Sequence, residues 1–344
     1  MASSKASAAA HVTIKDVAKA AGVSPTTVSH ALNDRGQVDP LTRERVKETA
    51  RRLGYRPNRH AQRLRTGEAH MIALISSMPF GVAGGPSRLG FLMEIAAVAA
   101  SAALTRGLAL VLVPPVESGS LRLDMLDVDA GLVVEPSAKD ASVEHFRKRG
   151  LPVVTIGRQP GVRQPAPYVD LRSAETTDLM LDHLWVRGAR RIALVIGDEQ
   201  RNSHVESEAA YAAFARRRRM RSEVVRVVEG QGEEGGYQAA RALLARRPEL
   251  DALCVPVDAF ASGAARAVTE SGRRIPGDVM LITRYDGLRA RTCQPPLTAV
   301  NMHLDETAQT AVELLFDHLR GSTSDRMRPG AAPQLVERES TTRL

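Results

Sequence analysis

A group of short polar side chains near the N-terminus has the composition of a surface that contacts nucleic acid. Hydroxyl, imidazole and amide groups recur there on one side of an expected helix, namely Thr26, Thr27, Ser29, His30 and Asn33. Such groups donate and accept hydrogen bonds, and they are short enough to meet base edges and phosphates in a major groove. Ser24 and the free amides at the start of the helix could bind one phosphate. We therefore expect this helix to contact double-stranded DNA.

The surrounding pattern predicts two short helices joined by a tight turn. Apolar residues at positions 14, 17, 18 and 21 repeat with helical periodicity. Gly22 can adopt the positive φ that ends a helix, Ser24 is a favoured N-cap, and Pro25 suits the first position of the next helix. Two short helices around a turn with glycine are typical of a helix-turn-helix.

A third helix is expected from the Asp39-Pro40 pair to about Leu53. Leu41, Val46 and Ala50 would then complete a three-helix core. A small helical bundle with no ligand would show the same apolar pattern, so the helices alone do not decide the function.

Positive charge is concentrated in the same segment. Residues 1–70 hold 13 Lys and Arg against 6 Asp and Glu, whereas residues 71–344 hold 34 against 33. Nearly all of the net charge of +8 therefore lies in the first fifth of the chain. A small basic unit beside a nearly neutral body is expected of a protein that binds a polyanion.

Residues 55–67 admit two interpretations. Arg59, Arg63 and Arg65 make the segment basic, and Leu64 is an apolar residue among them. A helix from Asn58 to the glycine at position 67 would be too short to be stable alone in water. The segment is either a basic linker or a helix that forms only on DNA, with Leu64 inserted in the minor groove.

From residue 71 onward, short apolar runs alternate with helical patterns, which predicts an α/β fold with parallel sheets covered on both faces. Strands are expected at 71–76, 109–113, 131–134, 153–156, 191–196, 224–228, 252–255 and 279–282. Helices are expected at 87–104, 174–186, 206–219, 237–245 and 259–270. One sheet of that size would be unusual, so we expect two lobes, with the chain crossing between them at Asp170.

Composition argues against several other classes of protein. Two cysteines cannot build a disulfide scaffold or a Cys-rich zinc site, and the nine histidines show no metal-ligand spacing. No apolar stretch is long enough to span a membrane, and the N-terminus has no signal peptide, so we expect a cytoplasmic protein. His204 and His303 are expected at the surface or behind a site.

One motif would suit a nucleotide-binding enzyme. Gly230, Gly232 and Gly235 form a GxGxxG pattern after an expected strand. Glu233 and Glu234 would however place negative charge against a pyrophosphate. We therefore expect no enzymatic activity, no cofactor and no metal.

Residues 12–66 resemble the DNA-binding headpiece and hinge of the LacI/GalR family of bacterial repressors. The resemblance rests on VTIKDVAKAAGVSPTTVSHALN at 12–33, TRERV at 42–46, LGYRPN at 53–58 and AQRL at 61–64. It implies that bases are contacted by Pro25, Thr26 and His30, and phosphates by Ser24, Thr27, Ser29, Asn33 and Tyr55. It also implies that Leu64, with Arg65 beside it, opens the central step of a near-palindromic operator, and that two headpieces act together.

The rest of the chain is similar, more loosely, to the two-lobed, periplasmic-binding-protein-like effector domain of that family. The expected organisation is a disordered tail (1–11), a headpiece (12–57), a hinge helix (58–67) and an effector-binding and dimerisation domain (71–344). The first lobe would hold about 71–169 and 302–326, and the second about 170–301 and 327–344. The tail after position 321 lacks apolar heptads, which favours a dimer over a coiled-coil tetramer.

The resemblance implies a small-molecule effector between the lobes. The matching positions are Arg88, Leu89, Asp170, Arg201, Ser203, Asp258, Tyr285 and Asp286. Ser207 stands where sugar-binding members often have arginine, and Gln231 stands where an aromatic residue stacks in purine binders. Both patterns are incomplete, so the class of effector is left open.

We therefore expect a dimeric, sequence-specific transcription regulator, a repressor whose affinity for a pseudo-palindromic operator changes with an effector. An activator of the same architecture, or a regulator whose cleft binds no small molecule, is the alternative. A solute-binding protein for transport would not need the headpiece. An architectural DNA binder would show similar affinity and salt dependence on all sequences.

Overall fold

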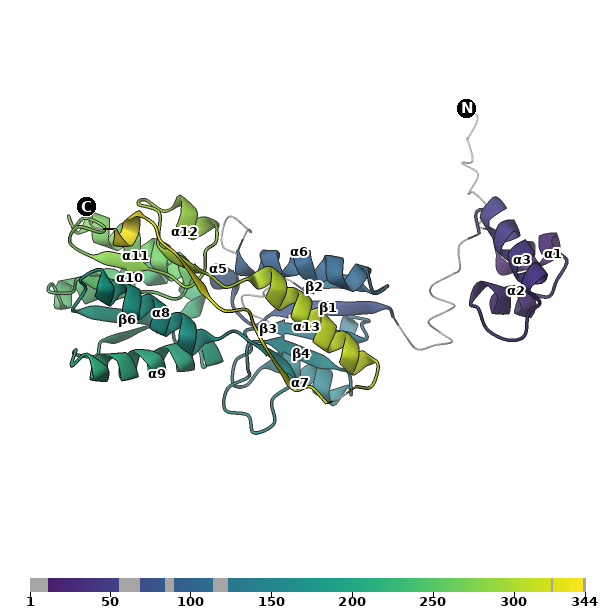
Figure 1. Ribbon diagram of the computed structural model, residues 1–344, viewed down its shortest axis with the longest axis horizontal. Coiled ribbons are helices and arrows are strands. Elements are labelled where there is room, and N and C mark those ends of the chain that lie inside the picture. Colours follow the sequence, from purple (N-terminus) through teal and green to yellow (C-terminus); the bar gives the residue numbers. More distant parts are fainter. Residues whose placement is uncertain (1–11, 56–68, 84–89, 114–122, 323, 343–344) are drawn as a thin grey trace, which may run out of the picture. The chain divides into compact units, whose positions relative to one another are not determined.

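The computed structural model describes residues 12–55, 69–83, 90–113, 123–322 and 324–342, which form two compact units (Figure 1). The boundary between the units follows residue 68. The first unit is a small bundle of helices, and the second is an α/β unit. Within the ranges described, no helix is long and apolar enough to cross a membrane.

The first unit confirms the predicted helix-turn-helix and its third helix. It comprises α1 (Ile14–Ala21), α2 (Pro25–Leu32) and α3 (Pro40–Arg52). Gly22 ends α1 with φ of 68°, and the core consists of Val17, Ala18, Ala21, Val28, Ala31, Val46 and Ala50. The prediction that Leu41 joins this core is wrong, because Leu41 lies in the first turn of α3 with 82% of its surface exposed. Val38, just before α3, packs against the core instead.

The first lobe of the second unit is built on a six-stranded parallel sheet in the order β11-β5-β4-β3-β1-β2. The strands are β1 (Met71–Ser76), β2 (Ala109–Val113), β3 (Ala130–Val134), β4 (Val153–Ile156), β5 (Tyr168–Asp170) and β11 (Met327–Pro329). The side chains of β1 alternate between two hydrophobic clusters, so both faces of the sheet are covered. Helices α6 (Phe91–Leu104) and α13 (Leu304–Leu319) cover one face, and α7 (Ala141–Lys148) covers the other.

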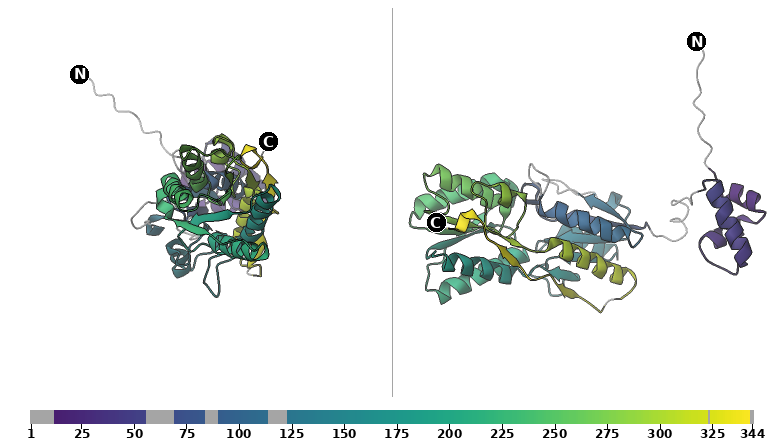
Figure 2. Two further views of the ribbon diagram at one scale, coloured as in Figure 1. Left: turned by 90° about the vertical axis from the view of Figure 1, so that its left-hand side faces the viewer. Right: turned by 45° about the horizontal axis from the view of Figure 1, so that its top comes forward.

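The second lobe has a four-stranded parallel sheet in the order β7-β6-β8-β9. Its strands are β6 (Ile192–Gly197), β7 (Val224–Val227), β8 (Ala252–Cys254) and β9 (Met280–Ile282). Helices α8 (Ser173–Val186) and α9 (Asn202–Arg217) lie on one face, and α10 (Gly232–Arg246) and α11 (Asp258–Glu270) lie on the other (Figure 2). The predicted parallel α/β architecture is therefore confirmed.

The chain crosses between the lobes three times. The first crossover follows Asp170, the second lies between β10 (Ala299–Asn301) and α13, and the third lies between β11 and β12 (Gln334–Val336). Strands β10 and β12 pair antiparallel, and Thr298, just before β10, bridges Ile282 of β9 in the second lobe. The remaining short elements are α5 (Phe80–Ala83), η1 (Leu123–Met125), η2 (Glu229–Gln231), α12 (Leu288–Thr292) and η3 (Glu339–Thr341).

Glycines allow two helices of the second lobe to lie unusually close. A Cβ built on Gly263 of α11 would lie 2.0 Å from the carbonyl oxygen of Glu233 in α10. A Cβ on Gly236 of α10 would lie 2.4 Å from the backbone of Phe260. The glycine-rich start of α10 therefore includes residues required for helix packing.

We predict that Gly263→Ala destabilises the second unit. The added methyl group would force α10 and α11 apart, at a cost of about 1–3 kcal/mol for an overpacked core. Urea denaturation monitored by the fluorescence of Trp185, the only tryptophan, would measure the loss. Gly230→Ala is the control, because a Cβ there meets nothing within 4 Å. Equal stability of the two variants would contradict the prediction.

Candidate nucleic-acid interface and inter-lobe site

The polar residues expected to contact DNA lie at the start and along the outer side of α2. Ser24 is the N-cap, and its Oγ accepts a hydrogen bond from the Thr27 amide at 3.1 Å and lies 2.9 Å from the Thr27 hydroxyl. Pro25 occupies the first helical turn, where its missing N–H costs nothing. The exposed side chains are Ser24, Pro25, Thr26 and His30, whereas Thr27 and Ser29 are half-buried.

Two further residues expected to contact phosphates also have structural partners. Asn33 Nδ2 donates to the carbonyl oxygen of Ser29 at 2.7 Å and so closes the end of α2. Tyr55 packs half-buried against the helical core, and burial raises the pKa of its phenol. Leu64, Arg65, Arg88 and Leu89, which were expected to contact DNA or effector, lie outside the described residues.

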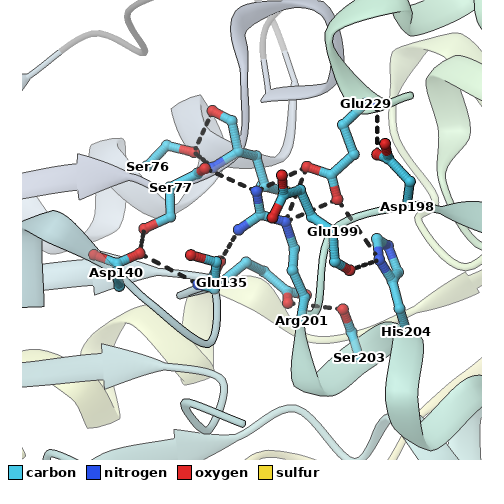
Figure 3. A network of polar contacts seen from close by, with 12 residues as sticks. Ser76, Ser77, Glu135, Asp140, Asp198, Glu199, Arg201, Ser203, His204 and Glu229 are labelled. Atoms are coloured by element: carbon cyan, nitrogen blue, oxygen red, sulfur yellow. Dashed lines mark hydrogen bonds and ion pairs between the residues drawn. The ribbon is translucent and has the colours of Figure 1, made fainter. Parts of the chain in front are cut away.

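Arg201 connects the two lobes of the second unit (Figure 3). It stands at the N-cap of α9 in the second lobe and is 3% exposed. Its Nε and Nη2 donate to the carboxylate of Glu229, also in the second lobe, at 2.7–3.0 Å. Nη2 also donates to the carbonyl oxygen of Ser77 at 2.8 Å, and Nη1 donates to the carbonyl oxygen of Glu135. These two carbonyls follow β1 and β3 of the first lobe, so one guanidinium binds both lobes.

Backbone contacts reinforce this connection. The amide of Ala138 donates to the carbonyl of Gln200 at 3.0 Å, next to an isolated antiparallel bridge between Ser137 and Arg201. Gly81 of α5 approaches the glycine-rich loop, because a Cβ on it would lie 3.1 Å from the carbonyl oxygen of Gly230. Gly230, the first glycine of the GxGxxG pattern, thus lies where the lobes meet.

Glu135 is the acid at the centre of the inter-lobe contact. It is 1% exposed, its Oε1 accepts from Arg284 Nη2 at 2.7 Å, and its Oε2 accepts from the Ser203 hydroxyl at 2.8 Å. Burial alone would raise the pKa of this carboxyl, but the charge of Arg284 and the two hydrogen bonds outweigh it, so the pKa lies below its ordinary value. Glu135 is therefore ionised at neutral pH.

Two of the predicted effector positions carry aspartates in different settings. Asp258 lies at the start of α11, where its carboxylate accepts from Arg289 at 3.2 Å, and burial raises its pKa. Asp170 lies at the first crossover and accepts from the amide of Arg172 at 3.1 Å. Asp258 lines the cavity described below, whereas Asp170 does not.

Tyr285 and Asp286 follow β9 and make different contacts. The Tyr285 hydroxyl donates to Glu94 of α6 at 2.7 Å, and its ring meets Phe91 edge-on with centroids 5.6 Å apart. Burial and the nearby carboxylate raise the pKa of Tyr285. Asp286 instead forms ion pairs with Arg291 at 3.1 Å and Arg338 at 2.6 Å. Tyr285 thus provides a further polar contact between the lobes, away from Arg201.

Two cavities of different size lie where the lobes meet. A cavity of about 30 Å³ is lined by residues that include Glu135, Arg201, Ser203, Asp258, Arg284 and Tyr285. Sites for small organic ligands usually measure about 300–1,000 Å³. A second, polar cavity of about 310 Å³ shares Tyr285 as a wall. The described residues include no group of three or more His, Cys, Asp and Glu that could hold a metal ion.

Sequence reasoning missed Glu135, Glu229 and Arg284. Each lies one or two residues after a short strand of a parallel sheet, β3, β7 or β9, and the carboxyl ends of such strands are where ligand sites form. A charged residue within two positions of the end of each strand was therefore a usable signal. His204, expected at the surface or behind a site, is buried, lies 3.6 Å from Glu229, and has its pKa lowered by burial.

We predict that Glu135→Gln weakens the dependence of stability on acid pH. The Glu135 pKa in the folded protein lies below the ordinary value of 4.5. Its ion pair therefore stabilises the fold above that pH, and the stabilisation disappears as the pH falls through the folded value. At neutral pH the variant should lose up to about 3–5 kcal/mol, because buried Arg284 loses its counter-charge.

Urea denaturation followed by Trp185 fluorescence, at neutral pH and below pH 4.5, would measure both effects. Glu175→Gln is the control, because the pair of Glu175 with Arg172 at 2.7 Å is partly solvent-exposed, with 49% and 33% of the two side chains accessible. That control should change stability by no more than about 1 kcal/mol. A Glu135→Gln variant with the wild-type pH profile would rule out this role for Glu135.

Comparisons with known proteins cover both units. Residues 13–58 match the family "Bacterial regulatory proteins, lacI family", and residues 181–341 match a periplasmic binding protein-like domain. The HTH-type transcriptional regulator CelR of Thermobifida fusca is 30% identical over 336 residues, which cover 95% of this chain and 98% of that protein.

Solved structures give the same relationship. A complex of the transcriptional regulator CelR with cellobiose has a TM-score of 0.71 at 29% identity, covering 96% of this chain and 99% of the other. A Lac repressor dimer bound to operator and the anti-inducer ONPF has a TM-score of 0.77 at 26% identity, with the same coverage.

Proposed function

The chain belongs to the lacI family of bacterial regulatory proteins and is a DNA-binding transcriptional regulator; we propose that it acts as a dimeric repressor of a pseudo-palindromic operator. The observation that carries the proposal is the exposed polar side of α2, which lies in the segment that matches the family's DNA-binding region. Operator DNA is chromosomal, so we place the protein in the cytoplasm.

We propose the following DNA contacts. Pro25, Thr26 and His30 contact bases in the major groove, and their exposure on one helix supports this assignment. Phosphates are bound by Ser24, Thr27, Ser29, Asn33 and Tyr55. Leu64 and Arg65 enter the minor groove at the centre of the operator.

We propose that the inter-lobe site binds a small-molecule effector. Relatives solved with cellobiose or ONPF support this assignment. A molecule that occupies the cavity of about 30 Å³ must separate the lobes or displace Arg201 and Tyr285. The adjoining cavity of about 310 Å³ is already within the size range of ligand sites. Effector binding would then compete with the hydrogen bonds that connect the lobes, and this competition would change the geometry presented to the headpieces. Arg201, Ser203, Asp258 and Tyr285 line the smaller cavity, and Asp286 lines the larger one beside Tyr285. Asp170 lines neither cavity.

We predict that Leu64→Ala loses most specific affinity for the operator but keeps weak binding to other DNA. The reason is that an apolar wedge stabilises the bent operator, whereas phosphate contacts act on any sequence. Mobility shifts on a selected operator and on a scrambled duplex, over a range of salt concentrations, would measure both. Leu41→Ala is the control, because Leu41 is an exposed leucine of the headpiece outside the proposed interface. Unchanged operator affinity in Leu64→Ala would exclude the wedge.

We also predict that a metabolite stabilises the second unit. A ligand at a hundred times its dissociation constant stabilises the folded state by about 2.7 kcal/mol. A thermal-shift screen of the full-length protein with sugars, sugar phosphates, nucleobases and other small metabolites would detect this. The same ligand should change operator affinity in a mobility shift. A panel without any hit would instead favour a regulator whose closed cleft has no small-molecule effector.

A further inference from the structure

The segment between α2 and α3 passes directly beside His30. A Cβ built on Gly36 would lie 2.8 Å from Nδ1 of His30, 3.3 Å from its Cγ and 3.4 Å from its Cε1. Real Cβ atoms do not approach other atoms to that shortest distance, so the imidazole occupies space that only a glycine leaves free. The Nδ1 edge of the ring therefore faces Gly36, and the Nε2 edge lies on the opposite side.

The path of this segment is determined by contacts with α3. Asp34 adopts a positive φ of 51°, and its carboxylate accepts hydrogen bonds from Arg43 at 2.8 Å and Lys47 at 3.0 Å. The amide of Arg35 donates to the carbonyl of His30 at 3.0 Å. Gly36 follows with φ of 67°. These contacts bring the backbone of Gly36 against the His30 ring.

An exposed histidine without such a neighbour would sample several rotamers. Ordering one long or flexible side chain on binding costs about 0.5–1.5 kcal/mol, equivalent to roughly a two- to tenfold change in affinity. A side chain that is already ordered before binding avoids part of that cost when it contacts a base. The contact with Gly36 would therefore bear on specificity at a base pair that His30 contacts.

We propose that Gly36 is a positioning residue for base recognition, which acts by holding the imidazole of His30 in the orientation that meets the operator. The inference rests on the proposed DNA contact of His30, and Gly36 itself need not touch DNA. Gly36 would then be a determinant of specificity outside α2, the helix that carries the proposed base contacts. The residue at position 36 thus influences which base is preferred.

Selection from a library of duplexes with two randomised, inverted half-sites would test the proposal. Full-length wild type, Gly36→Ala, His30→Ala and the double variant would each be used to select and sequence bound DNA. His30→Ala should flatten the preference at one or two base pairs of each half-site. Gly36→Ala should reduce the preference at those same pairs by about two- to tenfold. The double variant should match His30→Ala, because Gly36 acts through the ring.

Gly54→Ala is a matched control for backbone strain. Gly54 lies in the same unit with φ of 67°, and a Cβ there meets nothing within 4 Å. Its base preferences should remain those of the wild type. Gly36→Asn is a second test variant, because asparagine tolerates positive φ better than alanine but still adds a Cβ. Melting temperatures and the salt dependence of binding to scrambled DNA would show that the variants fold and still contact phosphates.

The outcomes separate this inference from the proposed function. The role of Gly36 would be overturned if Gly36→Ala and Gly36→Asn fold and keep the base preferences of the wild type. It would also be overturned if the double variant loses more preference than His30→Ala. A His30→Ala variant with the full wild-type preference would overturn it as well, while operator binding itself would stand. A wild type that selects no sequence would overturn the proposed function.

Discussion

Arg201 carries a positive charge in a place that water scarcely reaches, and such a charge costs several kcal/mol unless its hydrogen bonds are satisfied. Glu229 satisfies part of this requirement within the second lobe, and the carbonyls of Ser77 and Glu135 supply the remainder from the first. Those carbonyls follow two strands of one sheet, so their spacing is set by the sheet. The observed hydrogen bonding of Arg201 consequently requires this particular arrangement of the lobes.

The neighbouring charges follow the same principle. Arg284 reaches Glu135 across the lobes, and Ser203 takes the second oxygen of the same carboxylate. Arg284 and Ser203 bind the same carboxylate. A molecule that displaces one of them from Glu135 therefore also changes the surroundings of the other. Tyr285 adds a hydrogen bond to Glu94 at the edge of the small cavity. An effector would therefore act on a connected set of polar contacts, and not on one isolated side chain.

The pattern of apolar residues was sufficient to predict the three helices of the headpiece and the parallel α/β lobes. Strand β5, strands β10 to β12 and helices α7 and α13 were not predicted. Each of these strands has only three residues, too few to show a period. Helix α13 does show apolar periodicity at Leu304, Ala308, Ala311 and Leu315, and that signal was overlooked. The partners of Arg201 could not be predicted, because Ser77 and Glu135 contribute backbone carbonyls, which have no signature in a sequence.

The depth of the ion pairs where the lobes meet has a consequence for how the protein responds to salt. Dissolved ions screen exposed charges over about 10 Å, but they cannot enter between partners that are almost fully buried. Contacts with DNA phosphates, in contrast, weaken steeply as ionic strength rises. An osmotic upshift would accordingly lower occupancy of the operator while leaving the lobes as they are. Sensitivity to salt is therefore expected in the contacts with DNA and not in the connection between the lobes.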